Sequence, residues 1–250
     1  MAKKDKEGEI CMNACAIKPT LPFVTRKTIK KTPASAENRK RVEFMDSHNF
    51  SFSVDKETGV LCSKVEKKEY MNIKKYTKNY ENLAKKFTCG NIVIDKFLHD
   101  GSALDVNRGI TYIMLSDDNN CIIGFYNIEN GRVDRVETLG ETDVFELMGG
   151  SININYLAIH NDFQGVLVAQ DGEHKIYLGD LLLRDCERRI LKLREETGIS
   201  FVTICSTEEG YHLYHVRNGY EDFEEDMNTV VSESDMGCHK LYKWVDDIVN

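Results

Sequence analysis

The sequence predicts an α+β or α/β protein in which a central sheet is covered by helices on both faces. Short apolar runs that are typical of strands alternate along the chain with longer stretches whose apolar residues recur at helical spacing. The run SININYLAIH, residues 151–160, alternates at first and then becomes continuously apolar, as a strand buried between helices does. With 250 residues, 41% of them hydrophobic, the chain is long enough to form one large domain with a full core.

The first predicted element is a β-hairpin over residues 50–65. Phe50, Phe52 and Val54 alternate with polar residues, and the DKETG turn that follows offers Gly59 for a positive φ. A hairpin on its own is only marginally stable in water. We therefore expect this hairpin to dock on the rest of the protein or on a partner.

The main domain follows from residue 70 as alternating strands and helices. Short apolar runs predict strands over residues 71–76, 110–115, 121–128, 151–160, 199–205, 220–226 and 239–245. Helical patterns predict helices over residues 80–87, 91–104, 175–198 and 211–218. Between these elements, residues 131–139 are able to extend the sheet, residues 142–150 are ambiguous, and residues 161–174 are expected to form a loop.

Particular residues are expected to mark where the last two helices begin or end. Gly198 is expected just beyond the C-terminus of the helix over residues 175–198, because glycine readily takes the left-handed conformation found there. Ser206 and Glu209 form a Ser-x-x-Glu pattern, which predicts a capping box before the next helix. Gly219 is expected to end that helix.

The composition argues against several classes of protein and site. No run of about 18 apolar residues occurs, so no membrane span is expected. The basic N-terminus lacks the continuous apolar stretch of a secretory signal. The eight cysteines are scattered singly, without a Cys-x-x-Cys pair, so the sequence signals neither a zinc site nor a thioredoxin-like motif. We expect a reduced, cytoplasmic protein.

The charge is divided unevenly along the chain. Residues 1–90 hold 20 Lys and Arg against 11 Asp and Glu, a balance of +9, whereas residues 91–250 hold 13 against 30, a balance of −17. All three prolines also lie in the first 33 residues. We therefore expect a basic, disordered arm over residues 1–45, a hairpin-containing extension over residues 46–69 and the main domain over residues 70–250.

Two interpretations of the basic arm stay open. It is either a solubilising tail or a contact for nucleic acid, since clustered Lys and Arg side chains neutralise phosphates. Its composition cannot bury enough apolar area to offset the entropy of ordering. Removal of residues 1–45 is therefore expected to leave the fold intact.

One segment carries a resemblance to a known family. A Phe-x-Cys-Gly motif begins at Phe87, and an Asp-x-Phe-Leu motif begins at Asp95 on the next predicted helix. Two apolar runs joined by the turn SDDNN come next, and a strand, a capped helix and another strand follow residue 198. Over roughly residues 70–245 this order resembles the GNAT superfamily of acyl-CoA-dependent N-acetyltransferases, in the branch that contains bacterial toxin acetyltransferases.

The resemblance implies a fold, a reaction and a co-substrate. A GNAT protein has a mixed, mostly antiparallel central sheet with two splayed strands and helices on both faces. It transfers an acetyl group from acetyl-CoA, which is a co-substrate, to a primary amine, and no metal is implied. The backbone of the fourth strand binds the pantetheine arm, and Leu157, Ala158 and Ile159 match that part of the strand.

The resemblance also implies that the pyrophosphate binds where the following helix begins, because unpaired amides and the helix dipole favour anions there. The family pattern is Gln or Arg, two residues, Gly, one residue, then Gly or Ala, and in this sequence only Gly179 matches. His174 stands at the Gln or Arg position and Tyr177 at that of the first glycine. The implied contacts are His174, Lys175, Tyr177, Leu178, Gly179, Asp180 and Leu181.

A proton donor for the departing CoA thiolate is the third implied feature. The family uses a tyrosine in a Phe-Tyr-x-x-x-Gly-Phe pattern. By residue type the donor here is Tyr214, whereas strict spacing back from Gly219 assigns it to His215. A π-bulge, which is frequent at functional sites, is able to absorb the one-residue insertion and favours Tyr214.

The acceptor, the base and the partners stay open. His160, Asp162 and Glu141 are candidates for a group that deprotonates the amine, and nothing in the sequence distinguishes them. The acceptor amine belongs to a small molecule, a protein or an aminoacyl-tRNA. The resemblance further implies an antitoxin-like protein partner, and a homodimer is compatible with it. The alternatives to an active acetyltransferase are a catalytically degenerate GNAT fold and a nucleic-acid-associated binding protein.

Overall fold

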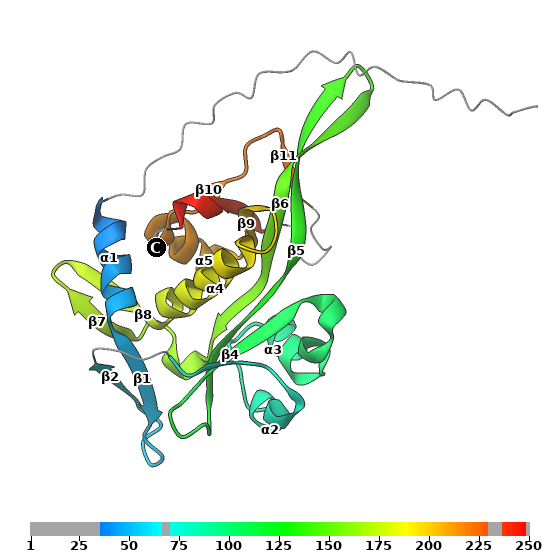
Figure 1. The fold of residues 1–250 in the computed structure, drawn as a ribbon. Coiled ribbons are helices and arrows are strands. Elements are labelled where there is room, and N and C mark those ends of the chain that lie inside the picture. Colours follow the sequence, from blue (N-terminus) through cyan, green and yellow to red (C-terminus); the bar gives the residue numbers. More distant parts are fainter. Residues whose placement is uncertain (1–35, 67–70, 230–236, 249–250) are drawn as a thin grey trace, which may run out of the picture. The chain divides into compact units, whose positions relative to one another are not determined.

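A mixed sheet forms the centre of the protein (Figure 1). The computed structural model describes residues 36–66, 71–229 and 237–248. Within them the sheet contains β3 (Ile73–Lys75), β4 (Ile110–Leu115), β5 (Ile122–Leu139), β6 (Thr142–Ile159), β9 (Ile199–Ser206), β10 (Glu221–Asp222), β11 (Met227–Thr229) and β12 (His239–Trp244). The strand order is β10-β12-β9-β6-β5-β4-β3, and β11 pairs with β5.

Among these described strands, only the pair of β6 and β9 is parallel, and the other neighbours are antiparallel. This arrangement confirms the mixed, mostly antiparallel sheet that the resemblance implies. Two hairpins lie outside the sheet: β1 (Asn49–Val54) with β2 (Leu61–Glu66), and β7 (Leu167–Asp171) with β8 (His174–Tyr177).

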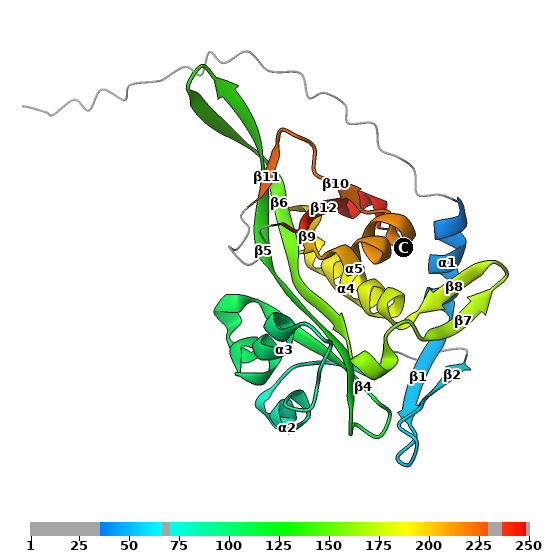
Figure 2. The ribbon, with the colours of Figure 1, turned by 180° about the vertical axis from the view of Figure 1, so that it is seen from behind.

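The helices flank the sheet on both sides (Figure 2). The α-helices are α1 (Ala36–Ser47), α2 (Glu81–Ala84), α3 (Ile92–His99), α4 (Leu178–Arg194) and α5 (Glu208–Tyr211), which a π-helix continues over His212–Arg217. Short 3₁₀ helices lie at Lys78–Tyr80, Ser102–Leu104, Val106–Arg108, Asn161–Phe163 and Val245–Asp247. None of the helices within the described residues is long and apolar enough to cross a membrane.

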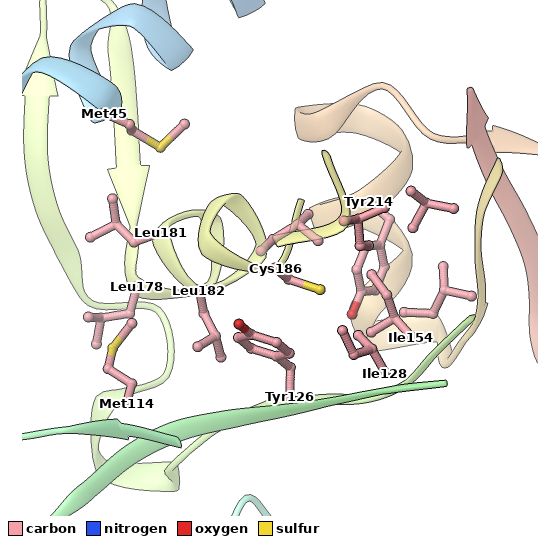
Figure 3. Packing of buried hydrophobic residues seen from close by; sticks show 14 of the residues in the cluster. Met45, Met114, Tyr126, Ile128, Ile154, Leu178, Leu181, Leu182, Cys186 and Tyr214 are labelled. Carbon is pink, nitrogen blue, oxygen red and sulfur yellow. The ribbon is translucent and has the colours of Figure 1, made fainter. Parts of the chain in front are cut away.

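Side chains of β4 and β5 alternate between two apolar clusters on opposite faces of the sheet, as strand geometry requires. Met114 and Tyr126 join a cluster with buried residues of α4 (Figure 3). Their neighbours Ile113 and Phe125 face the other side, where the rings of Phe125 and Phe97 of α3 lie 6.4 Å apart. Each such fully buried side chain stabilises the fold by about 1.5–3 kcal/mol. The predicted coverage of both faces by helices is confirmed.

The longest strands differ from the prediction. The ambiguous residues 142–150 are the first half of β6, and residues 131–139 belong to β5, so the two strands form one hairpin. The loop expected over residues 161–174 is wrong, because it contains β7 and most of the β7–β8 hairpin. A two-residue connection with Gly172 at a φ of 60° joins these strands. Glycine at the first position of a two-residue connection is a hairpin signal that the sequence offers.

The predicted helix boundaries also need correction. Residues 175–177 belong to β8, and α4 ends at Arg194, so Gly198 is not its C-terminal glycine. The carbonyl oxygen of Gly198 instead lies close to Gly150, since a Cβ added to Gly150 would be only 2.6 Å from that oxygen. The predicted capping box of Ser206 and Glu209 is wrong, because Thr207 is the N-cap of α5 and its side chain accepts from the amide of Gly210. The prediction for the end of that helix is confirmed by Gly219, whose φ is 68°.

The hairpin β1–β2 forms as predicted and docks on the main domain. Phe50 and Phe52 are buried, and Gly59 in the turn has a φ of 70°. The amide of Asp117 donates to the carbonyl of Phe52 over 2.7 Å, and the amide of Phe52 donates to the Asp117 carboxylate over 3.1 Å. The hairpin therefore gains from the main domain the contacts that it cannot supply itself.

The predicted disordered arm is partly wrong. Its last ten residues, 36–45, belong to α1, whereas residues 1–35 lie outside the described residues. Val42 and Met45 are buried against α4, and Figure 3 shows Met45 facing Leu181. The guanidinium of Arg184 donates to the Asp46 carboxylate over 3.0 Å. A helix with this burial does not behave as a tail, so removing residues 1–45 is now expected to destabilise the fold.

Met45→Ala tests the docking of α1. We expect it to lower the free energy of unfolding by about 2–3 kcal/mol, because it opens a cavity between α1 and α4. Glu43→Ala, at an exposed position of the same helix, is the control and should change the value by less than about 0.5 kcal/mol. Urea denaturation followed by circular dichroism measures both. Equal midpoints for the two variants would show that α1 is not part of the core.

Candidate active site

The two central strands part in the middle of the sheet. β6 pairs with β9 from Gly150 as far as the pair Ile154 and Ile204. Residues 156–159 of β6 continue to pair with β5 only, so within the described residues no strand lies against their other edge. An edge without a neighbouring strand is able to receive an extended ligand. This parting confirms the splayed strands that the resemblance implies.

A β-bulge marks the same place. Asn127 of β5 is opposite Tyr156, but the next residue, Ile128, is opposite Ile154, so Asn155 is an extra residue on β6. A bulge bends its strand and increases the local twist. The bend therefore begins at the residue where β6 leaves β9.

The predicted pantetheine-binding residues lie on the open part of β6. Ala158 is buried in the cluster beside α3, whereas Leu157 and Ile159 are half-buried against the cluster beside α4. The carbonyl of Ile159 accepts a hydrogen bond of 3.0 Å from the Gln164 side chain. The structure thus brings these three residues together beside the parting.

The predicted phosphate window has a different structure from a glycine-rich loop. His174 and Lys175 belong to β8, and Lys175 is exposed. Tyr177 is the N-cap of α4, and its amide donates to the Asp180 carboxylate over 3.0 Å. A carboxylate in the first turn interacts favourably with the helix dipole. This N-terminus therefore already carries a negative charge of the chain itself.

Asp180 is fully buried and lies among positive groups. Its Oδ1 accepts a hydrogen bond of 3.0 Å from Asn218, and it lies 3.5 Å from Nε of Arg217 and 3.9 Å from Nη1 of Arg41. The Arg217 guanidinium also lies 4.6 Å above the centre of the Tyr177 ring. Such a buried carboxylate needs these partners, because leaving a charge unpaired in the interior is costly.

Gly179 serves the packing of two helices. A Cβ at this position would lie 3.5 Å and 3.6 Å from the two methyl groups of Leu213 in the π-helix. Leu178 and Leu181 are buried in the cluster beside the sheet. The window therefore offers no open glycine cradle, and the positive charges near the start of α4 come from Arg41 and Arg217. The sequence gives no signal for Arg41, because α1 is distant along the chain.

The π-helix directs Tyr214 into the protein. The Tyr214 side chain is 4% exposed, its ring packs edge-on against Tyr220 with centroids 5.6 Å apart, and burial raises its pKa far above the usual value. In Figure 3 the ring extends from its helix toward Ile128 and Ile154. Ile154 is the last residue of β6 that pairs with β9, so the phenol is directed toward the parting.

The alternative donor, His215, faces outward. Its side chain is 39% exposed, stacks on Tyr211 with ring centroids 4.7 Å apart, and lies 3.7 Å from the Asp222 carboxylate. The π-helix absorbs the extra residue before Gly219 and separates the directions of the two side chains. The structure therefore places Tyr214 and not His215 beside the open strands.

The candidate bases lie in two distant places. His160 follows directly on β6, where its Nδ1 accepts a hydrogen bond of 3.2 Å from the amide of Asp162 and its ring packs on Phe87. The Asp162 side chain is 72% exposed. Glu141 lies in the turn between β5 and β6, roughly 45 Å along β6 from the bulge at about 3.3 Å per residue. Glu141 is therefore too far away to act at the parting.

The Phe-x-Cys-Gly motif builds the loop before α3. The Asp95 carboxylate accepts hydrogen bonds of 2.8 Å from the amide of Cys89 and from the Thr88 hydroxyl. The Gln164 side chain donates to the carbonyl of Cys89 over 2.8 Å and so ties this loop to the end of β6. Burial raises the pKa of the Cys89 thiol to about 12, so the thiol stays protonated at neutral pH. The motif has a structural role beside the open strand.

Comparison with known proteins supports the fold. No protein-family model and no curated protein sequence matches the chain. A solved structure of a tyrosine-to-phenylalanine mutant of the AtaT toxin is 17% identical with a TM-score of 0.50, over 71% of this chain and 91% of that chain. A second bacterial toxin is 14% identical with a TM-score of 0.50, over 71% and 93% of the two chains. The protein has the GNAT fold of these toxins, as the sequence predicts.

Asp180→Ala tests the buried charges at the start of α4. We expect it to lower the free energy of unfolding by about 3–5 kcal/mol, because Arg41 and Arg217 lose the carboxylate between them. Asp162→Ala removes an exposed carboxylate and should cost less than about 0.5 kcal/mol. Urea denaturation of both variants measures the difference. Equal losses would show that the charges around Asp180 do not hold α4, α1 and the π-helix together.

Proposed function

We propose that the protein is an N-acetyltransferase that transfers the acetyl group of acetyl-CoA to a primary amine. One observation carries the proposal: the open edge of β6 begins at Ile154, and the buried phenol of Tyr214 is directed toward the same residue. A strand edge for an extended ligand and a proton donor thus lie at one place. This is the pair of features that an acyl-CoA-dependent transferase needs.

The open edge suits the pantetheine arm of acetyl-CoA. The arm contains amide groups, which are able to pair with backbone groups along the edge of β6 that β9 leaves, as an added strand would. Leu157 and Ile159 lie beside that edge and offer half-buried apolar contacts. We assign Leu157, Ala158 and Ile159 to this contact.

The pyrophosphate is assigned to the start of α4. Its proposed contacts are the helix amides, the Arg217 guanidinium beside Asp180, and Lys175, which is exposed on β8. Asp180 acts indirectly, since it is fully buried and holds Arg217 and Arg41. The remaining proposed contacts are His174, Tyr177, Leu178, Gly179 and Leu181.

The reaction follows from these positions. The neutral amine attacks the carbonyl carbon of the thioester, and the carbon–sulfur bond breaks as the tetrahedral intermediate collapses. Tyr214 gives its hydroxyl proton to the departing sulfur. Burial raises the pKa of this phenol, so it is protonated before the reaction. The nitrogen releases a proton to solvent, and the phenol of Tyr214 regains a proton from solvent. His160 is the proposed carrier of the proton that leaves the nitrogen.

The acceptor amine is proposed at the level of a class. A small molecule, a protein and an aminoacyl-tRNA all offer a primary amine. The balance of −17 over residues 91–250 disfavours a polyanion, whereas the balance of +9 over residues 1–90 favours one. An antitoxin-like protein partner and a homodimer stay proposals that rest on the resemblance.

Tyr214→Phe tests the proposed donor. We expect kcat for acetyl transfer to fall by roughly 10²–10⁴, with the affinity for acetyl-CoA nearly unchanged, because phenylalanine keeps the packing and removes only the proton. Tyr211→Phe is a matched control on the same helix, since its hydroxyl contacts Asp222 at the surface over 3.0 Å. His215→Ala should likewise have a mild effect.

Steady-state kinetics with acetyl-CoA and a panel of amines measures these variants. A large loss in His215→Ala with a normal rate in Tyr214→Phe would contradict the assignment. Wild-type rates in both variants would show that proton donation does not come from this helix. No acetyl transfer by the unmodified protein to any class of amine would overturn the proposed function itself.

A further inference from the structure

A chain of side-chain hydrogen bonds crosses the sheet at the β-bulge. Asn155 Nδ2 donates to Asn127 Oδ1 over 2.8 Å, and Asn127 Nδ2 donates to the Thr111 hydroxyl oxygen over 3.0 Å. On the other side, Asn153 Nδ2 donates to Asn155 Oδ1 over 2.6 Å, and the Thr203 hydroxyl donates to Asn153 Oδ1 over 3.3 Å. The chain therefore connects β4, β5, β6 and β9, with the extra residue of the bulge at its centre.

Three members of this chain of hydrogen bonds, including both of its ends, are deeply buried. Thr111, Asn127 and Thr203 are 2%, 0% and 1% exposed, while Asn153 and Asn155 are half-buried. A buried carboxamide without a partner is costly, so Asn127 depends on both of its neighbours. The bulge is thereby fixed by side chains in addition to the strand ladder.

The chain of hydrogen bonds and the proposed proton donor, Tyr214, hold the bulge from opposite faces of the sheet. Asn127 has the same orientation along β5 as Phe125, which belongs to the cluster beside α3. Ile128 and Ile154, which follow and precede the bulge, belong to the cluster beside α4 together with Tyr214. A displacement of the bulge would therefore move the two residues toward which Tyr214 is directed.

We propose that Thr111, Asn127 and Asn155 are positioning residues that fix the bulge of β6, and thereby the opening that receives the thioester against Tyr214. This inference rests on the proposed function. It predicts that breaking the chain loosens residues 155–159 even when no ligand is present. It also predicts that catalysis suffers more than stability, because a misplacement of about 1 Å between reacting groups lowers rates by roughly 10²-fold.

Thr111→Val and Thr111→Ser are the decisive pair. Valine keeps the shape and removes the hydrogen-bond acceptor of Asn127, whereas serine keeps the hydroxyl. Asn155→Ala breaks the chain at a half-buried position and serves if Thr111→Val fails to fold. Thr229→Val is the structural control, since the Thr229 hydroxyl is also buried but donates to the Arg132 carbonyl over 2.9 Å, at the β11 end of the sheet.

Hydrogen–deuterium exchange of residues 155–159 and kcat/KM for acetyl-CoA are measured on the whole protein. Thr111→Val and Asn155→Ala should raise the exchange rate of these amides roughly tenfold above the wild-type rate, and lower kcat/KM roughly 10²-fold. Thr111→Ser should match the wild type. Thr229→Val should lower the melting temperature by about 2–4 °C and leave the exchange rate of residues 155–159 and kcat/KM at their wild-type values.

Wild-type exchange in the Thr111→Val and Asn155→Ala variants would overturn the inference, as would equal effects of Thr229→Val on exchange and kcat/KM. The exchange measurement needs no acetyl-CoA, so it separates this inference from the proposed function. A different outcome is that the unmodified protein transfers no acetyl group while the exchange rates of the variants change as expected. The hydrogen bonds then fix the bulge, but the proposed reaction is wrong. The catalytic part of the inference is overturned together with that reaction.

Discussion

The parting of β6 from β9 after Ile154 is the constraint on which the other features of the site depend. A central strand that loses its neighbour leaves backbone groups unpaired in the middle of a domain, which is unfavourable unless a ligand, water or a side chain serves them. The bulge at this parting is held at both faces of the sheet. The asparagine chain holds the bulge at Asn155 on one face, and Tyr214 packs beside Ile154 on the other.

The helices that cover the parting are fixed by a buried group of charges. Asp180 at the start of α4 joins Arg217 of the π-helix and Arg41 of α1. Further along α4, the Lys243 ammonium donates to Glu187 over 2.9 Å, with side chains 7% and 5% exposed. The charged side chains of such a group tolerate little movement, because displacing one of them would leave the charge of its partner unpaired. The position of the phenol thus depends on α1, which precedes the hairpin and the main domain along the chain.

The sequence predicts well what depends on local pattern. The strand Ile110–Leu115 has the predicted bounds, because its apolar residues and the turn after it are consecutive. The extra residue between Tyr214 and Gly219 predicts the π-helix, since a helix must bulge to keep both residues in place. Gly172, the first residue of the β7–β8 connection, is a hairpin signal that the predicted loop over residues 161–174 did not take into account.

Contacts between distant segments cannot be predicted in the same way. α1 has only a few apolar residues, and the burial of Val42 and Met45 depends on α4, which lies far away along the chain. For the same reason the pairing of Arg41 with Asp180 has no local signal. The asparagines of the chain likewise resemble ordinary polar residues of exposed strand positions until the strands are paired.

Calorimetric titration of the full chain with acetyl-CoA tests the central claim most directly, namely that the open edge of β6 is a site for this co-substrate. The account predicts a saturable heat and a rise in melting temperature as acetyl-CoA is added, because a ligand that binds the native state stabilises it. Absence of both effects at millimolar acetyl-CoA would contradict the account, since the parting of β6 and β9 would then be a feature of the fold without this ligand.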